Sequence, residues 1–312
     1  MSMTYTLQPV RETFFNLPAA SDAQAGSVAI FGAVHGTAYP RSIPDKPGIS
    51  APDAVRRAIT EASVHVDHWD FDFDGPLLND GALDVVDLGD VVTHYDDNAG
   101  NRAAIEAATR YIRAAGAIPL LIGGDDSAAI PFMRGFSDAE TLHILQIDAH
   151  IDWRDRIGDE PLGYSSTMRR ASELPFVRSM TQVGLRAVGS ARREEVETAK
   201  RWGSRLVTVR QVRANGVVEI ADAIPRDGAL LIHIDVDALD PSICPGVNAM
   251  SPGGLWLEEV TDLIASAMTG RTLAGFSIVE FQPKADVNGM TATVVGRLIC
   301  HVLGNLARKN GR

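Results

Sequence analysis

The chain has 312 residues, of which 45% are hydrophobic, enough to bury a sizeable core. Its 40 acidic and 29 basic residues give a formal net charge of -11, which excludes nucleic acid and anionic membrane surfaces as expected partners. We also expect no secretion signal and no apolar stretch that approaches bilayer-spanning length. Cys244 and Cys300 lie far apart in no CxxC pattern, which excludes a cysteine-based zinc site and fits a reducing, cytoplasmic location.

Short apolar runs alternate with helical segments along the chain. Strands are predicted at 27–33, 83–89, 117–123, 142–148, 180–185, 230–237 and 274–280. Helices are predicted at 51–62, 100–115, 191–202, 256–269 and 290–308, the first with Pro52 near its start. Several strands are apolar throughout, as in sheets covered on both faces. The pattern predicts an α/β fold: a single three-layer domain over 1–312, with a mostly parallel doubly wound sheet and an N-terminal extension of residues 1–25.

Acidic side chains follow four of these strands. They are Asp125 and Asp126 after the third strand, Asp148 at the end of the fourth with Asp152 and Asp155 after it, Asp235, Asp237 and Asp240 in and after the sixth, and Glu280 at the end of the seventh. His150 lies between Asp148 and Asp152. Parallel sheets bind ligands at the carboxyl ends of their strands. Residues two apart in an extended chain point to the same side. The side chains of Asp148, His150 and Asp152 can therefore converge, and so can those of Asp235 and Asp237.

So many buried carboxylates need compensation, and no equally dense set of Lys or Arg follows the same strands. Oxygen ligands with one imidazole suit hard or borderline divalent ions such as Mn(II), and this number of carboxylates suffices for two ions. The alternative is that each Asp is a separate loop acid or helix cap. The sequence predicts a cation site.

Four motifs carry a resemblance to the arginase and agmatinase family of ureohydrolases. They are GGDDS (123–127), DAHID (148–152), IDVDALDP (234–241) and VEFQP (279–283). The chain resembles agmatinase-like members more than arginase, over most of its length. The resemblance implies a binuclear site, with manganese usual and nickel in some members, and a homo-trimer or hexamer.

The resemblance also implies a ligand set. One ion would be bound by Asp126, Asp148, Asp152 and Asp235, and the other by Asp148, His150, Asp235 and Asp237. Asp148 and Asp235 would bridge the two ions, while Asp125 would serve the local backbone.

The sequence departs from the family at two positions. Asp126 stands where family members usually have His, so the site gains a carboxylate, which favours hard, oxygen-loving ions. Tyr164 is the nearest match to a family His that assists proton transfer. A phenol with a pKa near 10 is a poor shuttle at neutral pH but can orient a substrate or donate a hydrogen bond.

The implied reaction is hydrolysis of a guanidino group to urea and an amine. Glu280 would accept hydrogen bonds from the guanidinium, and Asp152 would pass a proton to the leaving amine. The loop after Asp152 lacks the pattern with which arginases hold an amino-acid head. We therefore expect a small cationic guanidino substrate other than arginine. Agmatine would have Asp155 or Asp159 near its amine, and a guanidino acid would have Arg154 or Arg156 near its carboxylate. The alternative is that all four are exposed loop charges. His35 either borders the pocket or only packs there.

Other functions stay open. The departures at 126 and 164 also fit a catalytically silent member that acts as a structural subunit of a hetero-oligomer. A hydrolase of another guanidine, such as a biguanide, is a second alternative, and a zinc deacetylase of similar architecture is a third. Metal contents near two, zero and one per chain separate the hydrolase, the silent subunit and the deacetylase.

Overall fold

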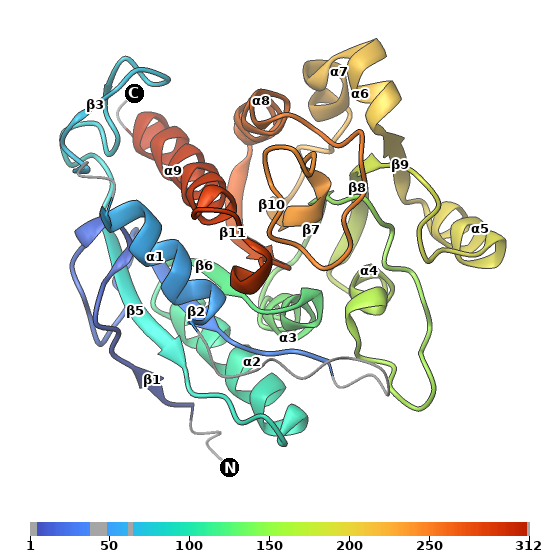
Figure 1. The fold of residues 1–312 in the computed structure, drawn as a ribbon, viewed down its shortest axis with the longest axis horizontal. Coiled ribbons are helices and arrows are strands. Elements are labelled where there is room, and N and C mark those ends of the chain that lie inside the picture. The colour runs from blue at the N-terminus through green and yellow to red at the C-terminus, as the bar shows by residue number, and fades with distance from the viewer. Residues whose placement is uncertain (1–4, 38–48, 62–64, 311–312) are drawn as a thin grey trace.

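A nine-stranded sheet runs through the centre of the molecule (Figure 1). The structure is a computed structural model that describes residues 5–37, 49–61 and 65–310. The strands are β1 Leu7–Gln8, β2 Val28–Ala33, β5 Val85–Val91, β6 Ile118–Gly123, β7 Leu142–Ile147, β8 Val177–Leu185, β9 Arg205–Thr208, β10 Ala229–Asp235 and β11 Thr272–Val279. Their order is β1-β5-β2-β6-β11-β10-β7-β8-β9, and every neighbouring pair is parallel except β1 with β5. The predicted doubly wound, mostly parallel sheet is confirmed.

The strands that the sequence pattern missed are short. β1 and β9 lie at the two edges of the sheet, and β3 (Trp69–Asp70) pairs with β4 (Gly75–Pro76) in a separate hairpin. Two to four residues are too few to show a strand period. The expected N-terminal extension supplies β1 and the fully buried Phe14, while its residues 1–4 lie outside the described residues.

Helices cover both faces of the sheet and complete the three layers. One face carries α1 Ala51–Glu61, α6 Val209–Asn215, α7 Val217–Asp222, α8 Leu257–Met268 and α9 Met290–Asn310. The other carries α2 Asn98–Ala114, α3 Ala129–Arg134, α4 Thr167–Ala171 and α5 Arg193–Trp202. Alternate strand residues supply the two cores: Ile30 packs with the first layer and Phe31 with the second. Both faces of the central strands are therefore apolar, as their sequence indicates.

Local signals account for the helix boundaries. α1 begins at Ala51, where the Asp53 amide donates to Ser50 Oγ at 3.1 Å as in an N-cap; residue 62 of the predicted helix lies outside the described residues. α5 ends at Trp202 and is followed by Gly203, whose φ of 103° is left-handed. The helices not predicted, α3, α4, α6 and α7, have five to seven residues each. Segments that short span at most two turns, so their periodicity is weak.

The long C-terminal helix corrects one expectation. No apolar stretch was expected to approach bilayer-spanning length, but Met290–Lys309 in α9 is long and apolar enough by length and composition alone. In the fold 72% of this apolar segment is buried, because α9 packs beside α1 and α8 on the sheet. Its apolar character is explained by its place in the core.

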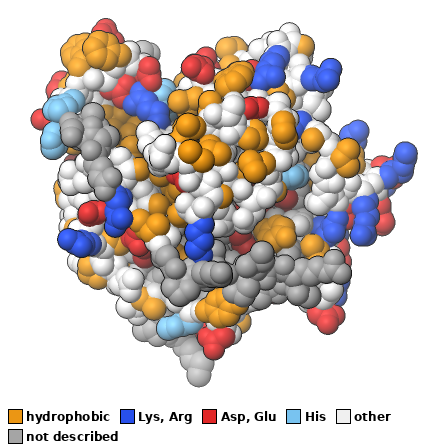
Figure 2. Space-filling view, in the orientation of Figure 1, with side chains coloured by type: hydrophobic (Ala, Val, Ile, Leu, Met, Phe, Trp, Pro, Cys, Tyr) orange, Lys and Arg blue, Asp and Glu red, His pale blue; other side chains and the backbone are white. Residues whose placement is uncertain are grey.

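Charged side chains of both signs are spread over the face seen in Figure 2. Basic side chains gather at its edge over α5, a helix that contains Arg193, Lys200 and Arg201. Three glutamates belong to the same helix, so this edge is not uniformly basic.

Candidate metal centre

The acid-bearing strands lie side by side in the middle of the sheet. β6, β11, β10 and β7 are consecutive neighbours, and because they are parallel, their carboxyl ends meet at one edge. This edge brings together side chains that are up to 154 residues apart in sequence. The six predicted metal ligands and Glu280 all follow or end these four strands: Asp126 after β6, Glu280 after β11, Asp235 and Asp237 at β10, and Asp148, His150 and Asp152 after β7.

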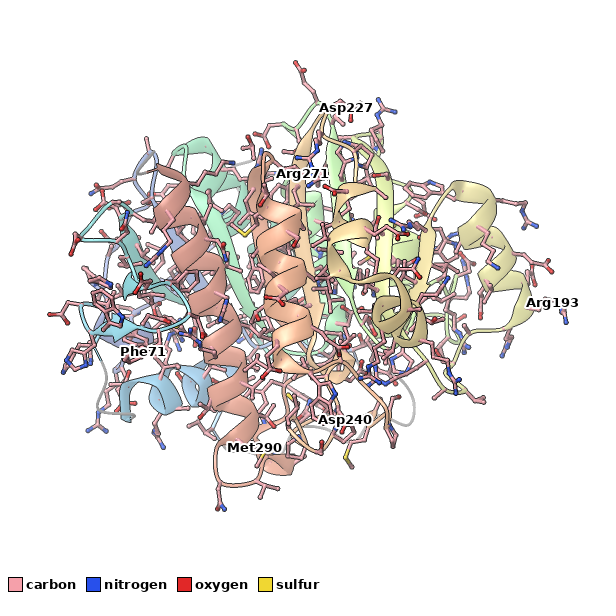
Figure 3. The ribbon with its side chains drawn as sticks, turned by 90° about the horizontal axis from the view of Figure 1, so that it is seen from above. Phe71, Arg193, Asp227, Asp240, Arg271 and Met290 are labelled. Carbon is pink, nitrogen blue, oxygen red and sulfur yellow. The ribbon has the colours of Figure 1, made fainter. Side chains whose placement is uncertain are left out.

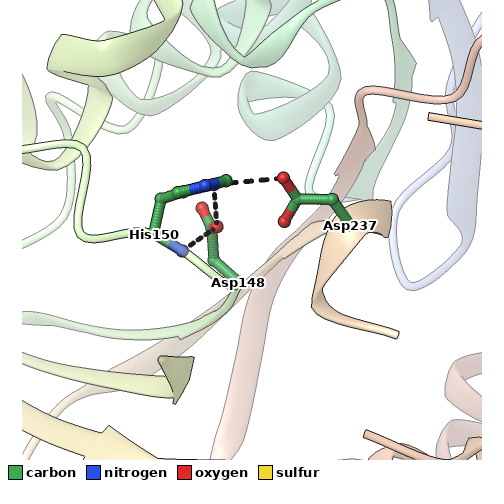
Figure 4. A group of neighbouring side chains, drawn as sticks. All are labelled: Asp148, His150 and Asp237. Carbon is green, nitrogen blue, oxygen red and sulfur yellow. Dashed lines mark hydrogen bonds and ion pairs between the residues drawn. The ribbon is translucent and has the colours of Figure 1, made fainter. Parts of the chain in front are cut away.

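Asp148, His150 and Asp237 form the tightest group (Figure 4). One potential ligand atom from each lies within 4.8 Å of the others. His150 Nδ1 is 3.1 Å from Asp237 Oδ2 and 3.5 Å from Asp148 Oδ1. A nitrogen and two oxygens at such spacing could share one cation.

Turns, and not extended strands, bring the DAHID and DVD side chains together. β7 already ends at Ile147, and Asp152 has a left-handed φ of 43°, which is uncommon for a residue other than glycine. Asp235 is the last residue of β10, and its Oδ1 accepts the Asp237 amide at 2.8 Å as a short helical turn begins. The convergence predicted from an extended chain therefore arises by another route.

Two glutamines hold the carboxylates of Asp148 and Asp152 through hydrogen bonds. Gln146 Nε2 donates to Asp148 Oδ2 at 2.6 Å and lies 2.9 Å from Asp152 Oδ2. Gln182 Nε2 in turn donates to Gln146 Oε1 and to the Ile151 carbonyl. All of these amide groups are fully buried, so the network fixes the carboxylate orientations with satisfied partners.

The adjacent acids Asp125 and Asp126 face different partners. Asp125 accepts bonds from the Ser127 amide at 2.9 Å and the Thr37 amide at 2.6 Å, which is the local backbone role expected for it. Asp126 Oδ1 is 2.7 Å from His233 Nε2, whereas its Oδ2 is buried without a hydrogen-bond partner among the described residues. An unpaired buried carboxylate oxygen is costly and marks a place where a cation fits.

Burial and mutual repulsion dominate the electrostatics of the protein alone. Burial, then repulsion from Asp148 and Asp126, raises the pKa of Asp152 well above its ordinary value. Burial, then repulsion from Asp237 and Asp148, does the same to the pKa of Asp235. These shifts show that the cluster resists full ionisation, and divalent cations would remove that resistance.

His150 compensates part of this charge in the protein alone. Burial opposes its protonation, but hydrogen bonds with Asp148 and Asp237 outweigh burial and raise the pKa of His150 to about 10. A cation bound by the same three side chains would replace that proton, since a ligating imidazole must be neutral.

Glu280 and Tyr164 lie beside the acid cluster. Glu280 has a left-handed φ of 66°, and its Oε1 accepts the Asp126 amide at 2.8 Å. Burial raises the pKa of Tyr164, and the negative charges of Glu280 and Asp125 raise it further. A pKa above the ordinary value near 10 keeps the Tyr164 hydroxyl protonated at neutral pH, and the residue as a whole is 39% exposed.

The structure places the candidate substrate residues in unequal positions. Arg154 donates to the Ser190 carbonyl and lies 3.4 Å from Glu195, and Asp155 pairs with Arg170 at 2.8 Å. His35 is 2% exposed, and neither of its ring nitrogens has a hydrogen-bond partner among the described residues. Its carbonyl accepts the Asp125 amide at 3.0 Å, so His35 borders the site through its backbone.

Sequence reasoning missed the residues that hold the acids in place. Gln146 and His233 each lie two positions before the first acid of a motif, Asp148 and Asp235 respectively. A polar side chain inside an otherwise apolar buried strand is the signal that could have found them, since such groups need a partner. Arg186, which donates to the carbonyls of Asp237, Ala238, Leu239 and Ser251, carries no comparable signal.

Known proteins share this sequence pattern and fold. Residues 28–304 match the Arginase family. Guanidinopropionase of Pseudomonas aeruginosa is 30% identical over 73% of each chain. N(1)-aminopropylagmatine ureohydrolase of Thermococcus kodakarensis is 26% identical over 80% of this chain and 83% of the relative. The solved structure of proclavaminate amidino hydrolase from Streptomyces clavuligerus superposes with a TM-score of 0.83 at 24% identity, covering 96% of this chain and 98% of that one.

Proposed function

The chain belongs to the arginase family, and we propose that it is a binuclear-metal hydrolase that cleaves a guanidino C–N bond and releases urea and an amine. Its named relatives are hydrolases, so the assignment to a hydrolase family is confirmed. The observation that carries the proposal is the convergence of five aspartates, one histidine and Glu280 at one edge of the sheet.

Six side chains are the proposed ligands. Asp126, Asp148, Asp152 and Asp235 form one set, and Asp148, His150, Asp235 and Asp237 form the other. Two divalent cations, Mn(II) or Ni(II), would supply Lewis-acid activation of water in this site. The excess of carboxylate over imidazole favours Mn(II), the harder of the two ions.

Glu280 and Asp152 act on the substrate in this proposal. The carboxylate of Glu280 accepts hydrogen bonds from the planar guanidinium and sets its orientation. Its Oε1 also accepts the Asp126 amide, which fixes the Glu280 side chain next to the ligand sets. Asp152 passes a proton to the leaving amine, and Tyr164 donates a hydrogen bond at the rim.

The loop after Asp152 is the proposed reader of the substrate tail. Arg154 would bind the carboxylate of a guanidino acid, and Asp155 would bind the amine of an agmatine-like substrate. Both already have ion-pair partners, Glu195 and Arg170, so a tail would have to compete with them. Arg154→Ala should raise KM for guanidino acids, whereas Asp155→Asn should raise KM for agmatine.

Urea release tests the proposed reaction. Chain loaded separately with Mn(II) and Ni(II) is assayed with agmatine, arginine, guanidinobutyrate, guanidinopropionate, guanidine and biguanides, alongside metal analysis. We expect urea from one of these and about two ions per chain. Asp148→Asn and Asp235→Asn should lose both. Asp138→Asn, which changes an exposed ion pair with Arg113, should match the parent.

The alternatives have different outcomes in the same assay. Retained turnover in Asp148→Asn or Asp235→Asn contradicts the ligand scheme. Neither metal nor urea in the parent favours the silent subunit of a hetero-oligomer, and one ion per chain favours the deacetylase. A cytoplasmic location and a homo-trimer or hexamer remain part of the proposal, and light scattering of the purified chain measures the subunit count.

A further inference from the structure

A buried histidine connects the two strands on either side of β11. His233 lies in β10 directly opposite Ser277 of β11, and its Nδ1 is 2.9 Å from Ser277 Oγ. Its Nε2 reaches Asp126 Oδ1, after β6, at 2.7 Å. Since an ionised carboxylate only accepts, Nε2–H donates to Asp126. In a neutral ring Nδ1 then accepts from the Ser277 hydroxyl. Both ring nitrogens are therefore engaged, and the ring orientation is fixed.

This contact determines which oxygen of Asp126 remains available. Oδ1 is occupied by His233, while Oδ2 is buried with no hydrogen-bond partner among the described residues. The main chain of Asp126 is also held, because its amide donates to Glu280 and its carbonyl accepts from Thr167. Since the main chain and Oδ1 of Asp126 are both held, the short side chain allows Oδ2 to point in only one direction.

The same contact limits the space at 126. The imidazole of His233 lies 2.7 Å from Asp126 Oδ1, so a side chain at 126 that points the same way has to fit beside that ring. A carboxylate fits between His233 and the ligand cluster. The departure from the family pattern at 126 is thus matched by the residue that faces it.

We propose that His233 is a positioning residue for the metal centre: it holds Asp126 through Oδ1 so that Oδ2 serves as the ligand atom. The inference rests on the proposed metal site. In this role His233 does not contact the substrate, and Ser277 fixes the orientation of its ring through Nδ1. Ligands oriented in this way lose about 10- to 100-fold in metal affinity when the supporting residue is removed.

The protein contains a matched control at the opposite end of the sheet. His143 is a buried residue of β7, in register with Ser179; its Nδ1 is 2.8 Å from Ser179 Oγ and its Nε2 is 3.0 Å from Asp227. Asp227 precedes β10 and Asp240 follows it, and Figure 3 shows them at opposite ends of the molecule. His143 therefore makes the same set of contacts far from the acid cluster.

The test compares two amides that differ by one methylene. His233→Gln carries an N–H donor near the position of Nε2, whereas His233→Asn reaches only as far as Nδ1. Mn(II) affinity is measured by calorimetry on the full chain, bound Mn(II) is examined by electron paramagnetic resonance, and folding is checked by circular dichroism. We expect His233→Asn to lose about tenfold or more in affinity at one of two sites, with His233→Gln within about threefold and His143→Asn unchanged.

The outcomes separate this inference from the function it rests on. Equal Mn(II) affinity in His233→Asn, His233→Gln and the parent overturns the positioning role while leaving the hydrolase proposal standing. Equal losses in both amides also overturn it, because the donor at Nε2 would then make no difference. A parent that binds no Mn(II) overturns both. If His233→Asn does not fold, Ser277→Ala against Ser179→Ala decides: a loss of Mn(II) affinity confined to the former supports the inference, and equal affinity overturns it.

Discussion

Burial in the fold, more than the neighbouring sequence, determines the environment of a single side chain in this molecule. His35 illustrates this, because a histidine in a loop after a strand fits either an accessible pocket residue or a packed one. In the structure it is almost fully buried. Burial, with a smaller contribution from Arg102, lowers the pKa of His35 to about 4.

That shift predicts a pH dependence of stability. Between pH 6.5 and about 4 the unfolded chain binds a proton at His35 that the folded chain does not, so His35 destabilises the fold as pH falls. His35→Gln stays neutral throughout and should lose about 2 to 3 kcal/mol less stability than the parent between pH 7.5 and 4.5. Urea unfolding at several pH values measures this, and parallel pH profiles for the two proteins would contradict it.

For the long helices and strands, the elements predicted from the sequence pattern agree with those in the structure. The predicted strands from 27–33 to 274–280 all appear within a few residues of their expected bounds, because apolar runs covered on both faces have few alternatives. β8 begins at Val177, earlier than predicted, where exposed and half-buried polar residues interrupt the apolar run. The two-residue strands and the shortest helices depend on neighbours distant in sequence, so no local pattern could reveal them.

The candidate site likewise contains residues that the sequence could predict and residues that it could not. The motif acids could be predicted because the carboxyl ends of four parallel strands lie at the same edge of the sheet. The residues that hold those acids could not, since the role of His233 depends on Ser277 and Asp126, which approach it from two other parts of the chain. The turn at Asp152, with its left-handed φ, is likewise fixed by tertiary contacts.

Two buried ion pairs that share Arg56 fix α1 against the sheet. Arg56, with a fully buried side chain, forms two bonds to Asp87 at 2.8 and 2.9 Å and one to Asp90 at 2.6 Å. Arg56→Leu leaves both carboxylates buried without that partner and should lower the free energy of unfolding by about 3 to 5 kcal/mol.

The neighbouring Arg57 provides the control. Its side chain is 53% exposed and lies 3.6 Å from Glu12, so Arg57→Leu should change stability by less than about 1 kcal/mol. Urea unfolding followed by circular dichroism compares the two variants. Similar losses of stability in both variants would contradict a specific role for the buried ion pairs of Arg56.

On the scale of the whole molecule, the fold collects negative charge at one edge of its sheet. The chain carries a formal net charge of -11, and five aspartates and Glu280 meet where β6, β11, β10 and β7 end. Two imidazoles accompany these acids among the described residues: His150 lies beside Asp148 and Asp237, and His233 contacts Asp126. Such an arrangement is stable at neutral pH when cations are bound to it.

Anomalous diffraction from crystals grown with Mn(II) tests this arrangement most directly. The proposed ligand scheme predicts two manganese peaks between the ends of β6, β11, β10 and β7, with Asp148 and Asp235 close to both and Asp126 Oδ2 close to one of them. Fully loaded crystals with one peak, with none at this edge, or with Asp126 turned away from both would contradict the binuclear centre.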